Sequence, residues 1–185
     1  MPDLAGIFVG GRAIRMGGVA KGLLNSASGE TLIARWRRLF GELGAASVLV
    51  GCHEAYADLG IECIADDPPG IGPLGGLNAL LARAGQGSVI AVACDMPFVS
   101  LELLGKLASY ASGAPIVAPR HDGLWEPLFA RYDAPQVIAV ARKHALAGER
   151  SLQGLLDELG AESLPLAQHE LDQLRDWDRP EDRLL

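Results

Sequence analysis

Short apolar runs alternate along most of the chain with segments whose apolar residues recur every three or four positions. A continuous apolar run predicts a strand that is covered on both faces, and the longer period predicts an amphipathic helix. The predicted strands are 4–9, 47–50, 61–64, 88–94, 115–118 and 163–166, and the predicted helices are 32–43, 74–84, 101–110, 134–146 and 151–159. This alternation indicates βαβ units and an α/β fold with a mostly parallel sheet.

The pattern changes after residue 113. Segment 125–132 is short and apolar, and the turn signal Asp122-Gly123 precedes it. We therefore expect a reversed or an edge strand there, which would make the sheet mixed. No internal repeat, low-complexity tract or linker interrupts the sequence, so we expect one domain over residues 1–185.

Length and charge narrow the class of protein. A chain of 185 residues can bury one sizeable core but is short for two domains. A net charge of −7 argues against a nucleic-acid surface, which needs a basic stripe. No signal peptide or membrane-spanning run is recognisable, and the three cysteines have no zinc spacing. Cys63 and Cys94 fall in strand-like runs and are expected to be buried thiols, and we expect a soluble cytoplasmic protein.

The segment from Val9 to Lys21 follows the first predicted strand and holds two glycine pairs, Arg15 and Lys21. Glycines allow successive backbone N–H groups to form a nest for phosphate, and the two cations would neutralise a bound triphosphate. The segment is neither a P-loop, because Gly22 follows Lys21, nor a G-x-G-x-x-G fingerprint. A nucleoside triphosphate is the expected ligand, and a loop that merely turns the chain is the alternative.

Two carboxylate positions follow predicted strands, at the edge where open parallel sheets bind ligands. Asp66 follows strand 61–64, and Asp95 follows the most hydrophobic strand. Asp95 is well placed to hold Mg²⁺, a cation that prefers oxygen ligands. Its alternative role is a helix N-cap, for which Ser100 is the better candidate. Lys21 would then offset the charge of the triphosphate during transfer.

Other candidates are less specific. The glycines of segment 70–76 would let the backbone approach a flat base, or would simply form a turn before the next helix. Arg150 could bind a second anion or could be an exposed arginine at a helix start. The histidines lack ligand spacing and no G-x-S-x-G elbow is present, so covalent hydrolase chemistry has no support.

Several motifs occur in register over nearly the whole chain. They are Phe8-Val9-Gly10-Gly11, Arg15-Met16-Gly17-Gly18-Val19-Ala20-Lys21, Gly72-Pro73-Leu74-Gly75-Gly76, Cys94-Asp95-Met96-Pro97 and Asp176-Trp177-Asp178-Arg179-Pro180-Glu181-Asp182. Together they resemble the molybdenum cofactor guanylyltransferases, which belong to the Rossmann-like nucleotidyltransferases. The resemblance implies a three-layer α/β/α fold and Mg²⁺-dependent transfer of GMP from GTP to the terminal phosphate of molybdopterin. It also implies a nucleotide half over about 1–112 and an acceptor half over about 113–185 of the single domain.

The resemblance also implies roles for individual residues. The residues expected to bind the nucleotide are Phe8, Val9, Gly10, Gly11, Lys21, Asp66, Gly72, Pro73, Leu74 and Asp95. The catalytic residues would be Arg15, Lys21 and Asp95, and Asp95 would also be the metal ligand. The acceptor would be bound by Arg150, Asp176 and Asp178. His121, Asp122 and Glu126 lie in regions similar to the acceptor side. The acceptor phosphate is already a nucleophile, so no strong general base is required.

Alternatives remain open at this point. The donor could be CTP, as in the sister cytidylyltransferases, the acceptor could be a sugar phosphate, or the chain could bind nucleotide without catalysis. Three departures from the family pattern bear on this choice: Ala20 replaces an aspartate, Gly51 an asparagine found in some members, and Val9 an alanine. We expect activity to survive them. The expected partners are GTP, molybdopterin and transiently other cofactor-synthesis or molybdoenzyme proteins, with no membrane or nucleic acid, and the expected state is a monomer.

Overall fold

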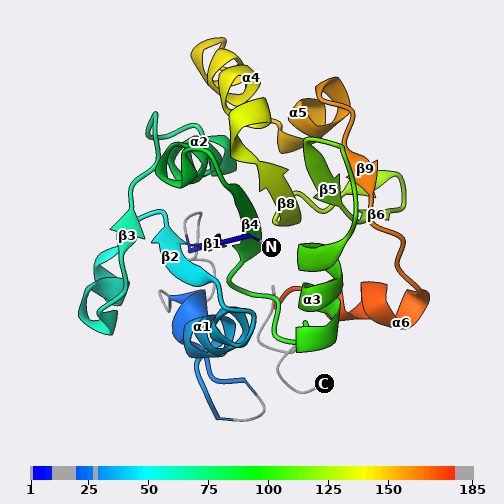
Figure 1. Ribbon diagram of the computed structural model, residues 1–185. Coiled ribbons are helices and arrows are strands. Elements are labelled where there is room, and N and C mark those ends of the chain that lie inside the picture. The colour runs from blue at the N-terminus through cyan, green and yellow to red at the C-terminus, as the bar shows by residue number, and fades with distance from the viewer. Residues whose placement is uncertain (1, 10–19, 27–28, 178–185) are drawn as a thin grey trace.

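The computed structural model describes residues 2–9, 20–26 and 29–177, and its centre is a seven-stranded sheet (Figure 1). The strands are β1 (Leu4–Phe8), β2 (Ala46–Val50), β3 (Cys63–Ile64), β4 (Ser88–Ala93), β5 (Ile116–Ala118), β6 (Arg120–His121), β7 (Leu124–Trp125), β8 (Phe129–Asp133) and β9 (Glu162–Ser163). The helices are α1 (Leu32–Glu42), α2 (Pro73–Ala84), α3 (Leu101–Ser109), α4 (Ala134–Leu146), α5 (Leu152–Glu158) and α6 (Gln168–Leu171), with 3-10 helices η2 (Lys21–Leu23), η3 (Glu54–Leu59) and η4 (Asp172–Leu174).

The sheet has the order β3-β2-β1-β4-β8-β5-β9. β1 pairs in parallel with both β2 and β4, and β5 pairs in parallel with β9. β8 is antiparallel to its neighbours β4 and β5. The reversed strand expected within 125–132 is therefore confirmed, but its alternative placement at an edge is wrong, because β8 lies inside the sheet. The α/β class and the mostly parallel mixed sheet are confirmed.

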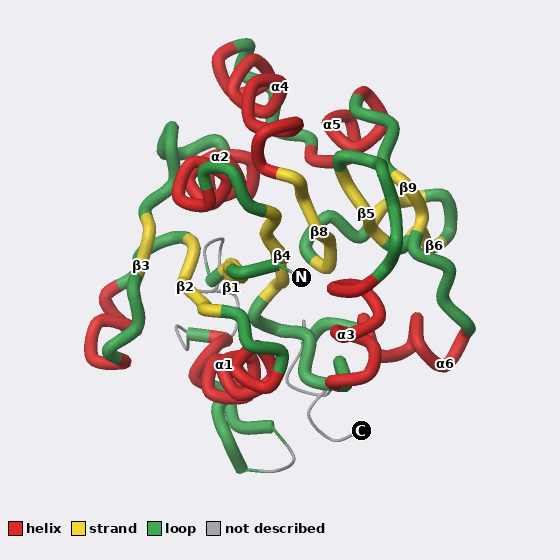
Figure 2. The backbone as a smooth tube through the Cα atoms, viewed as in Figure 1, coloured by secondary structure: helices red, strands yellow, loops and turns green. Residues whose placement is uncertain are grey.

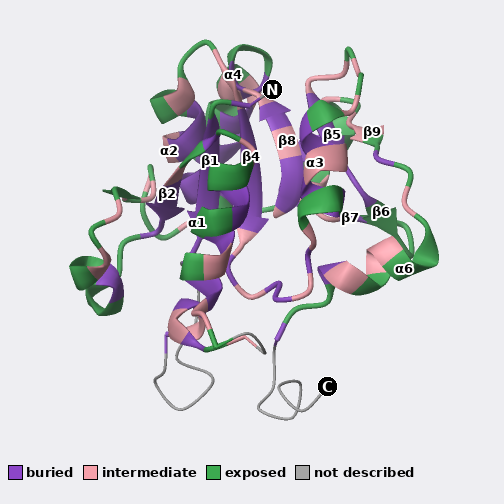
Figure 3. Cartoon of the chain, turned by 60° about the horizontal axis from the view of Figure 1, so that its bottom comes forward, coloured by how far each residue is buried: buried purple, intermediate pink, exposed green. Residues whose placement is uncertain are grey.

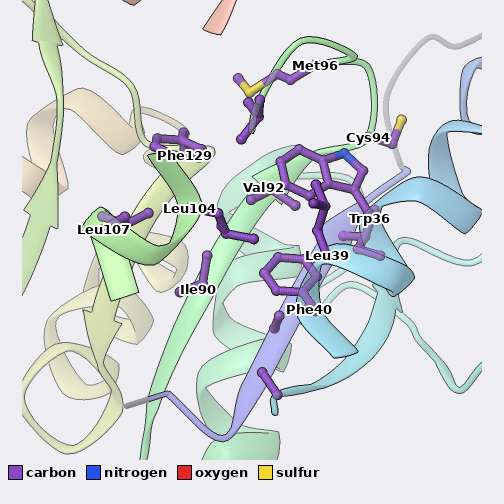
Figure 4. Packing of buried hydrophobic residues seen from close by; sticks show 14 of the residues in the cluster. Trp36, Leu39, Phe40, Ile90, Val92, Cys94, Met96, Leu104, Leu107 and Phe129 are labelled. Carbon is purple, nitrogen blue, oxygen red and sulfur yellow. The ribbon is translucent and has the colours of Figure 1, made fainter. Parts of the chain in front are cut away.

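Helices cover both faces of this sheet, which gives the three expected layers (Figure 2). One face carries α1 and α3, whose apolar side chains pack on Ile7 and Ile90. Figure 4 shows the centre of this cluster, with Trp36 stacked on Phe40 at a ring-centroid distance of 5.5 Å. The other face carries α2, α4 and α5. Since both faces are covered, β1 is buried along its whole length, as its continuous apolar run predicts (Figure 3).

Side-chain caps explain where several helices begin. The Thr31, Ser100, Asp133 and Ser151 side chains each accept a backbone N–H from the first turn of α1, α3, α4 and α5. The predicted boundaries of these helices therefore agree with the structure within a few residues. Within the described part of the chain, no helix is long and apolar enough to cross a membrane.

Short elements differ more from the predictions. The predicted strand 61–64 contributes only β3, and 163–166 is replaced by β9, which ends at Ser163. Segment 125–132 is split between β7 and β8, and β6 and β7 form a hairpin around the predicted Asp122-Gly123 turn. Cys94 is buried as expected, but Cys63 is exposed, which contradicts its prediction. β3 is an edge strand, so one of its sides has no covering neighbour.

Candidate active site

The order of the first four strands makes the boundary between β1 and β4 a topological switch point, where open α/β sheets have their ligand crevice. The chain leaves β1 for β2 and β3 on one side and returns to β4 on the other. In such a sheet the carboxyl ends of the two strands diverge into separate loops, and ligands bind between these loops. The Cys94 N–H donates to the Phe8 carbonyl oxygen over 3.1 Å, which keeps the strand ends together up to the crevice. Lys21 and Asp95 come from the two loops that leave it.

The Lys21 ammonium donates to the Asp95 carboxylate over 2.8 Å, and the side chains are 14% and 17% exposed. Lys21 begins η2 after the glycine segment, and Asp95 is two residues past β4. The alternative role of Asp95 as an N-cap does not apply, because the Ser100 hydroxyl accepts the Leu103 N–H of α3. The structure thus brings the two most specific candidates of the sequence together at the crevice.

Tyr56, in η3, holds the backbone next to Lys21, a role that the sequence did not indicate. Its hydroxyl oxygen accepts the Gly22 N–H over 3.3 Å, one residue after Lys21. Burial is the main reason that the pKa of Tyr56 is raised to about 12, with the Cys94 and Asp95 charges adding to it. A Cβ at Gly22 would stand 2.6 Å from Ile33 Cδ1, so any larger residue would have to displace this buried side chain of α1. Tyr56 lies in η3, and no motif marks it.

The second glycine cluster packs the start of α2 against the loop that carries Asp66. A Cβ at Gly75 would be 2.5 Å from the Pro68 carbonyl oxygen, and one at Gly76 would be 2.9 Å from Phe8 Cε1 and 3.2 Å from Asp66 Oδ1. The Asp67 N–H also donates to the Gly75 carbonyl oxygen over 3.0 Å. Burial raises the pKa of the half-buried Asp66 carboxyl. Packing therefore explains these glycines whether or not the backbone also contacts a nucleotide base.

The other nucleotide-binding candidates have different environments. Gly72 and Pro73 are exposed at the start of α2, where Gly72 has a φ of +75°. Phe8, Val9 and Leu74 are buried in the hydrophobic clusters, so any ligand contact would have to come from their backbone. Gly10, Gly11 and Arg15 lie outside the described residues.

The C-terminal part of the described chain is attached to the Asp95 loop. The Trp177 N–H donates to the Asp95 main-chain oxygen over 2.9 Å, and the Gln173 side chain accepts the Ser100 N–H over 2.9 Å. The Trp177 ring is buried and meets Phe98 edge to face at 6.3 Å. Asp176 is exposed beside this anchor. Asp178 lies outside the described residues.

Asp176 is also close to the residues after β5. Burial raises the pKa of Glu126, the negative charge of Asp176 raises it further, and His121 lowers it. These three residues therefore share one electrostatic environment. Asp122 is exposed at the tip of the β6–β7 hairpin, with a φ of +50°. Arg150 is exposed one residue before Ser151, the N-cap of α5. This position matches the alternative interpretation of Arg150 as an exposed arginine at a helix start.

The Asp95 carboxylate fits a divalent cation. It already accepts a cationic group, the Lys21 ammonium, at 2.8 Å, and carboxylate oxygens are the ligands that Mg²⁺ prefers. No group of three or more His, Cys, Asp or Glu side chains suited to a metal occurs within residues 2–9, 20–26 and 29–177.

A three-layer fold with a lysine–aspartate pair at the switch between β1 and β4 defines a nucleotidyltransferase-like protein. Comparison with known proteins gives the family. Residues 5–163 match the model of the MobA-like NTP transferase domain, and the chain belongs to this family of nucleotidyltransferase enzymes.

Individual relatives agree with the family. The chain is 35% identical over 182 residues to a molybdenum cofactor guanylyltransferase of Pseudomonas putida, which covers 95% of the chain and 92% of that protein. It is 37% identical over 169 residues to one of Pseudomonas aeruginosa, with 87% and 83% covered. Among solved structures, molybdopterin-guanine dinucleotide biosynthesis protein A of Archaeoglobus fulgidus is similar with a TM-score of 0.78 and 26% identity, covering 98% of this chain and 95% of that one.

Proposed function

We propose that this enzyme transfers GMP from GTP to the terminal phosphate of molybdopterin and releases pyrophosphate. The names of the relatives support the donor and the acceptor. The observation that carries the proposal is the Lys21–Asp95 pair at the crevice between β1 and β4, since this pair offers a cation and an oxygen ligand where a triphosphate would enter.

The nucleotide is proposed to lie along the crevice. The Gly10 and Gly11 backbone, with Phe8 and Val9, would contact the guanine and phosphates, and the Asp66 loop with Gly72, Pro73 and Leu74 would border the nucleoside. Lys21 and Arg15 would contact the triphosphate. The close packing of Gly75 and Gly76 against the Asp66 loop supports this placement, because it fixes both segments relative to β1.

Asp95 is proposed to hold Mg²⁺, which, when bound, would neutralise phosphate charge and orient the triphosphate. The Lys21 ammonium lies 2.8 Å from Asp95 and would exchange this contact for the phosphates when GTP enters. In the reaction an oxygen of the acceptor phosphate forms a bond to the α-phosphorus of GTP. The bond from that phosphorus to the oxygen bridging to the β-phosphate breaks, and pyrophosphate leaves. Lys21 would stabilise the charge that develops on the leaving oxygens.

The acceptor is proposed to lie on the side of Asp176, with Asp178 and Arg150 as further contacts. The Trp177 anchor supports this placement, because it holds Asp176 next to the Asp95 loop. Glu126 and His121 share the environment of Asp176 and would border the same ligand. The acceptor phosphate is ionised at neutral pH, so the site needs to position this nucleophile and does not need to deprotonate it.

The proposal extends to the organisation of the protein. Residues about 1–112 would form the nucleotide half and residues about 113–185 the acceptor half of one domain. We propose a cytoplasmic monomer that meets other cofactor-synthesis or molybdoenzyme proteins transiently. The described cysteines are present as free thiols, which fits a reducing compartment.

Labelled GTP tests the bond that breaks. With molybdopterin and Mg²⁺, label in the α-phosphate should enter the dinucleotide, and label in the γ-phosphate should leave as pyrophosphate. A γ-label that enters the pterin product would mean phosphoryl transfer and contradict the proposal. Binding of GTP without release of pyrophosphate would favour a non-catalytic protein.

A further inference from the structure

Two thiols lie together at the edge of the sheet. Cys63 is the first residue of β3, and Cys52 follows the end of β2 by two residues. Both side chains line the same pocket at this edge, and both residues are exposed. Cys94, in contrast, is buried beneath the Asp95 loop.

The backbone explains why these cysteines meet. Leu49 of β2 is in register with Cys63, so a straight continuation of β2 would carry Cys52 three residues, or about 10 Å, past it. Gly51 has a φ of +88°, a conformation that glycine adopts readily, and it turns the chain at the end of the strand. Its N–H still donates to the Ile64 carbonyl oxygen over 2.9 Å, which holds the turn against β3.

The pair borders a pocket that adjoins the candidate active site. The pocket has a volume of about 340 Å³ and is lined by Cys52, His53, Glu54, Tyr56, Ala57, Ile61 and Cys63. Tyr56 connects it to the lysine, since its hydroxyl holds the Gly22 N–H. Residues 53–56 and this hydrogen bond therefore form a continuous path from Cys52 to Gly22, the residue after Lys21.

We propose that Cys52 and Cys63 form a reversible disulfide in the presence of a peroxide, and that this disulfide slows nucleotidyl transfer. The Cys52 thiolate attacks one peroxide oxygen, which gives a sulfenic acid and a hydroxide that takes up a proton to become water. The Cys63 sulfur then attacks the Cys52 sulfur, the S–S bond forms, and the second oxygen leaves as water. The two thiols are oxidised by two electrons and the peroxide is reduced by two.

Cys52 is the sulfur that reacts first. Partial desolvation where β3 meets its neighbours, the adjacent Cys52 sulfur and the charge of Asp66 raise the pKa of Cys63. This favours the neutral thiol at Cys63, and a thiol reacts with peroxide far more slowly than a thiolate. Its position next to Cys52 suits it to the second step, in which the sulfenic acid is converted to the disulfide.

The effect on activity follows from the geometry and depends on the function proposed above. Bonded sulfur atoms lie much closer than hydrogen-bonded ones, so closing the disulfide draws residue 52 toward β3. The start of η3 follows, and the Tyr56–Gly22 hydrogen bond that supports Lys21 is displaced. We expect turnover to fall about tenfold or more, since misplacing a catalytic group by about 1 Å can cost about 10²-fold.

Peptide mass mapping tests the disulfide without any activity measurement. Folded wild-type protein is treated with hydrogen peroxide, its remaining thiols are alkylated, and it is digested without reduction. We expect one crosslinked peptide pair containing Cys52 and Cys63, and alkylation of Cys52 and Cys63 after reduction with a thiol. Alkylatable Cys52 and Cys63 after peroxide treatment, or disulfides only between two molecules, would overturn the proposal.

A second arm tests the effect on activity against Cys52→Ser, which can form neither the sulfenic acid at this position nor the disulfide. Oxidised wild-type enzyme should lose turnover and regain it with a thiol reductant, whereas the variant should keep its activity through the same treatment. Equal losses in both proteins would mean damage elsewhere, and an unchanged rate in crosslinked wild type would overturn the regulatory part. If neither protein is active before oxidation, the proposed function is contradicted. The disulfide is then still tested by the mass of the crosslinked peptides.

Discussion

The main-chain N–H of Trp177 donates to the main-chain oxygen of Asp95 over 2.9 Å. This bond joins the C-terminal part of the described chain to the loop that follows the central strand β4. The proposed metal ligand Asp95 and the proposed acceptor residue Asp176 are thereby held next to each other. The relative position of the proposed metal site and the proposed acceptor site therefore depends on this hydrogen bond and on the packing of the Trp177 ring.

Trp177→Ala should therefore weaken acceptor binding. The ring is buried against Leu24, Leu32 and Phe98, so its removal should lower the free energy of unfolding by about 3 kcal/mol. The KM for molybdopterin should rise about tenfold, because Asp176 loses its position. Urea unfolding and initial rates at varied acceptor concentration measure the two effects.

Trp177→Phe is the matched control for this change. The indole Nε1 is buried and has no hydrogen-bond partner among the described residues, so phenylalanine keeps most of the packing and loses no bond. Stability and acceptor KM should stay near those of the wild type. A Trp177→Ala enzyme with an unchanged acceptor KM would separate the C-terminal segment from acceptor binding.

Asp95→Asn should lower kcat by about 10²–10³-fold, the range found when one group that stabilises a transition state is removed. The amide oxygen can still accept the Lys21 ammonium, so the unfolding free energy should change by only about 1 kcal/mol. Steady-state rates at saturating Mg²⁺ and thermal unfolding test both statements. Near wild-type turnover would remove Asp95 from the mechanism.

Lys21→Ala should lower kcat about 10²-fold or more if the ammonium stabilises developing phosphate charge. Arg83→Ala serves as the control, because the Arg83–Glu62 pair has a similar distance of 2.9 Å but is exposed on the surface. The control should keep its activity. A loss below about threefold in Lys21→Ala would show that the lysine has only a structural role.

Gly75→Ala should disturb the Asp66 loop. The new methyl group would stand 2.5 Å from the Pro68 carbonyl oxygen, so the backbone must shift, at a cost of about 1–3 kcal/mol. The KM for GTP should rise when the Asp66 loop is displaced.

Gly105→Ala in α3 is the control. The nearest atom to the added methyl group would be 3.9 Å away, so this change should stabilise the protein by about 0.5–1 kcal/mol. Opposite signs in the two unfolding experiments are the expected result, and a neutral Gly75→Ala would contradict the packing argument.

Glu126 should give stability a pH dependence. Because burial and then Asp176 raise its pKa, the folded state binds this proton more tightly than the unfolded state, and stability falls as the pH rises from the unfolded pKa through the folded one. Glu126→Gln should therefore raise the melting temperature at pH 7, and the gain should vanish when the pH is lowered below the unfolded pKa.

Glu170→Gln provides the opposite sign for that experiment. The hydrogen bond from Lys106 lowers the Glu170 pKa, so this carboxylate stabilises the protein above its unfolded pKa and loses the effect as the pH falls through the folded one. Its replacement should lower the melting temperature at pH 7 and have little effect in acid. Parallel curves for the two variants would refute the assignment of the Glu126 shift.

The central strands and the separate candidates Lys21 and Asp95 were predictable from local signals, whereas the contact between these two side chains was not. The runs of β1 and β4 are apolar because both faces are covered, so Asp95 just after β4 and Lys21 at the end of the glycine segment after β1 stand out in the sequence. The place of β8 was not predictable in the same way. Phe129, Ala130 and Tyr132 are buried while Arg131 and Asp133 are half-buried, and the partners of β8, β4 and β5, are set by packing between segments distant in the sequence.

The sequence did not reveal which candidate side chains are buried in the core and which reach the site. Phe8 and Leu74 occur within motifs but have core side chains, and Cys63 was assigned to the core although β3 is a short edge strand. Tyr56 was missed because its contact with Gly22 joins two short 3-10 helices, η2 and η3, that are far apart in the sequence and share no motif. The roles of the individual site residues stay predictions, and the variants above test several of them.

The most direct test of the central claim is the mass of the product formed from molybdopterin, Mg²⁺ and equal amounts of GTP and CTP. We expect the guanine dinucleotide from the wild-type enzyme, and a loss of this product in Asp95→Asn. A cytosine dinucleotide would keep the mechanism but contradict the proposed donor. Absence of either dinucleotide despite GTP binding would contradict the proposed function.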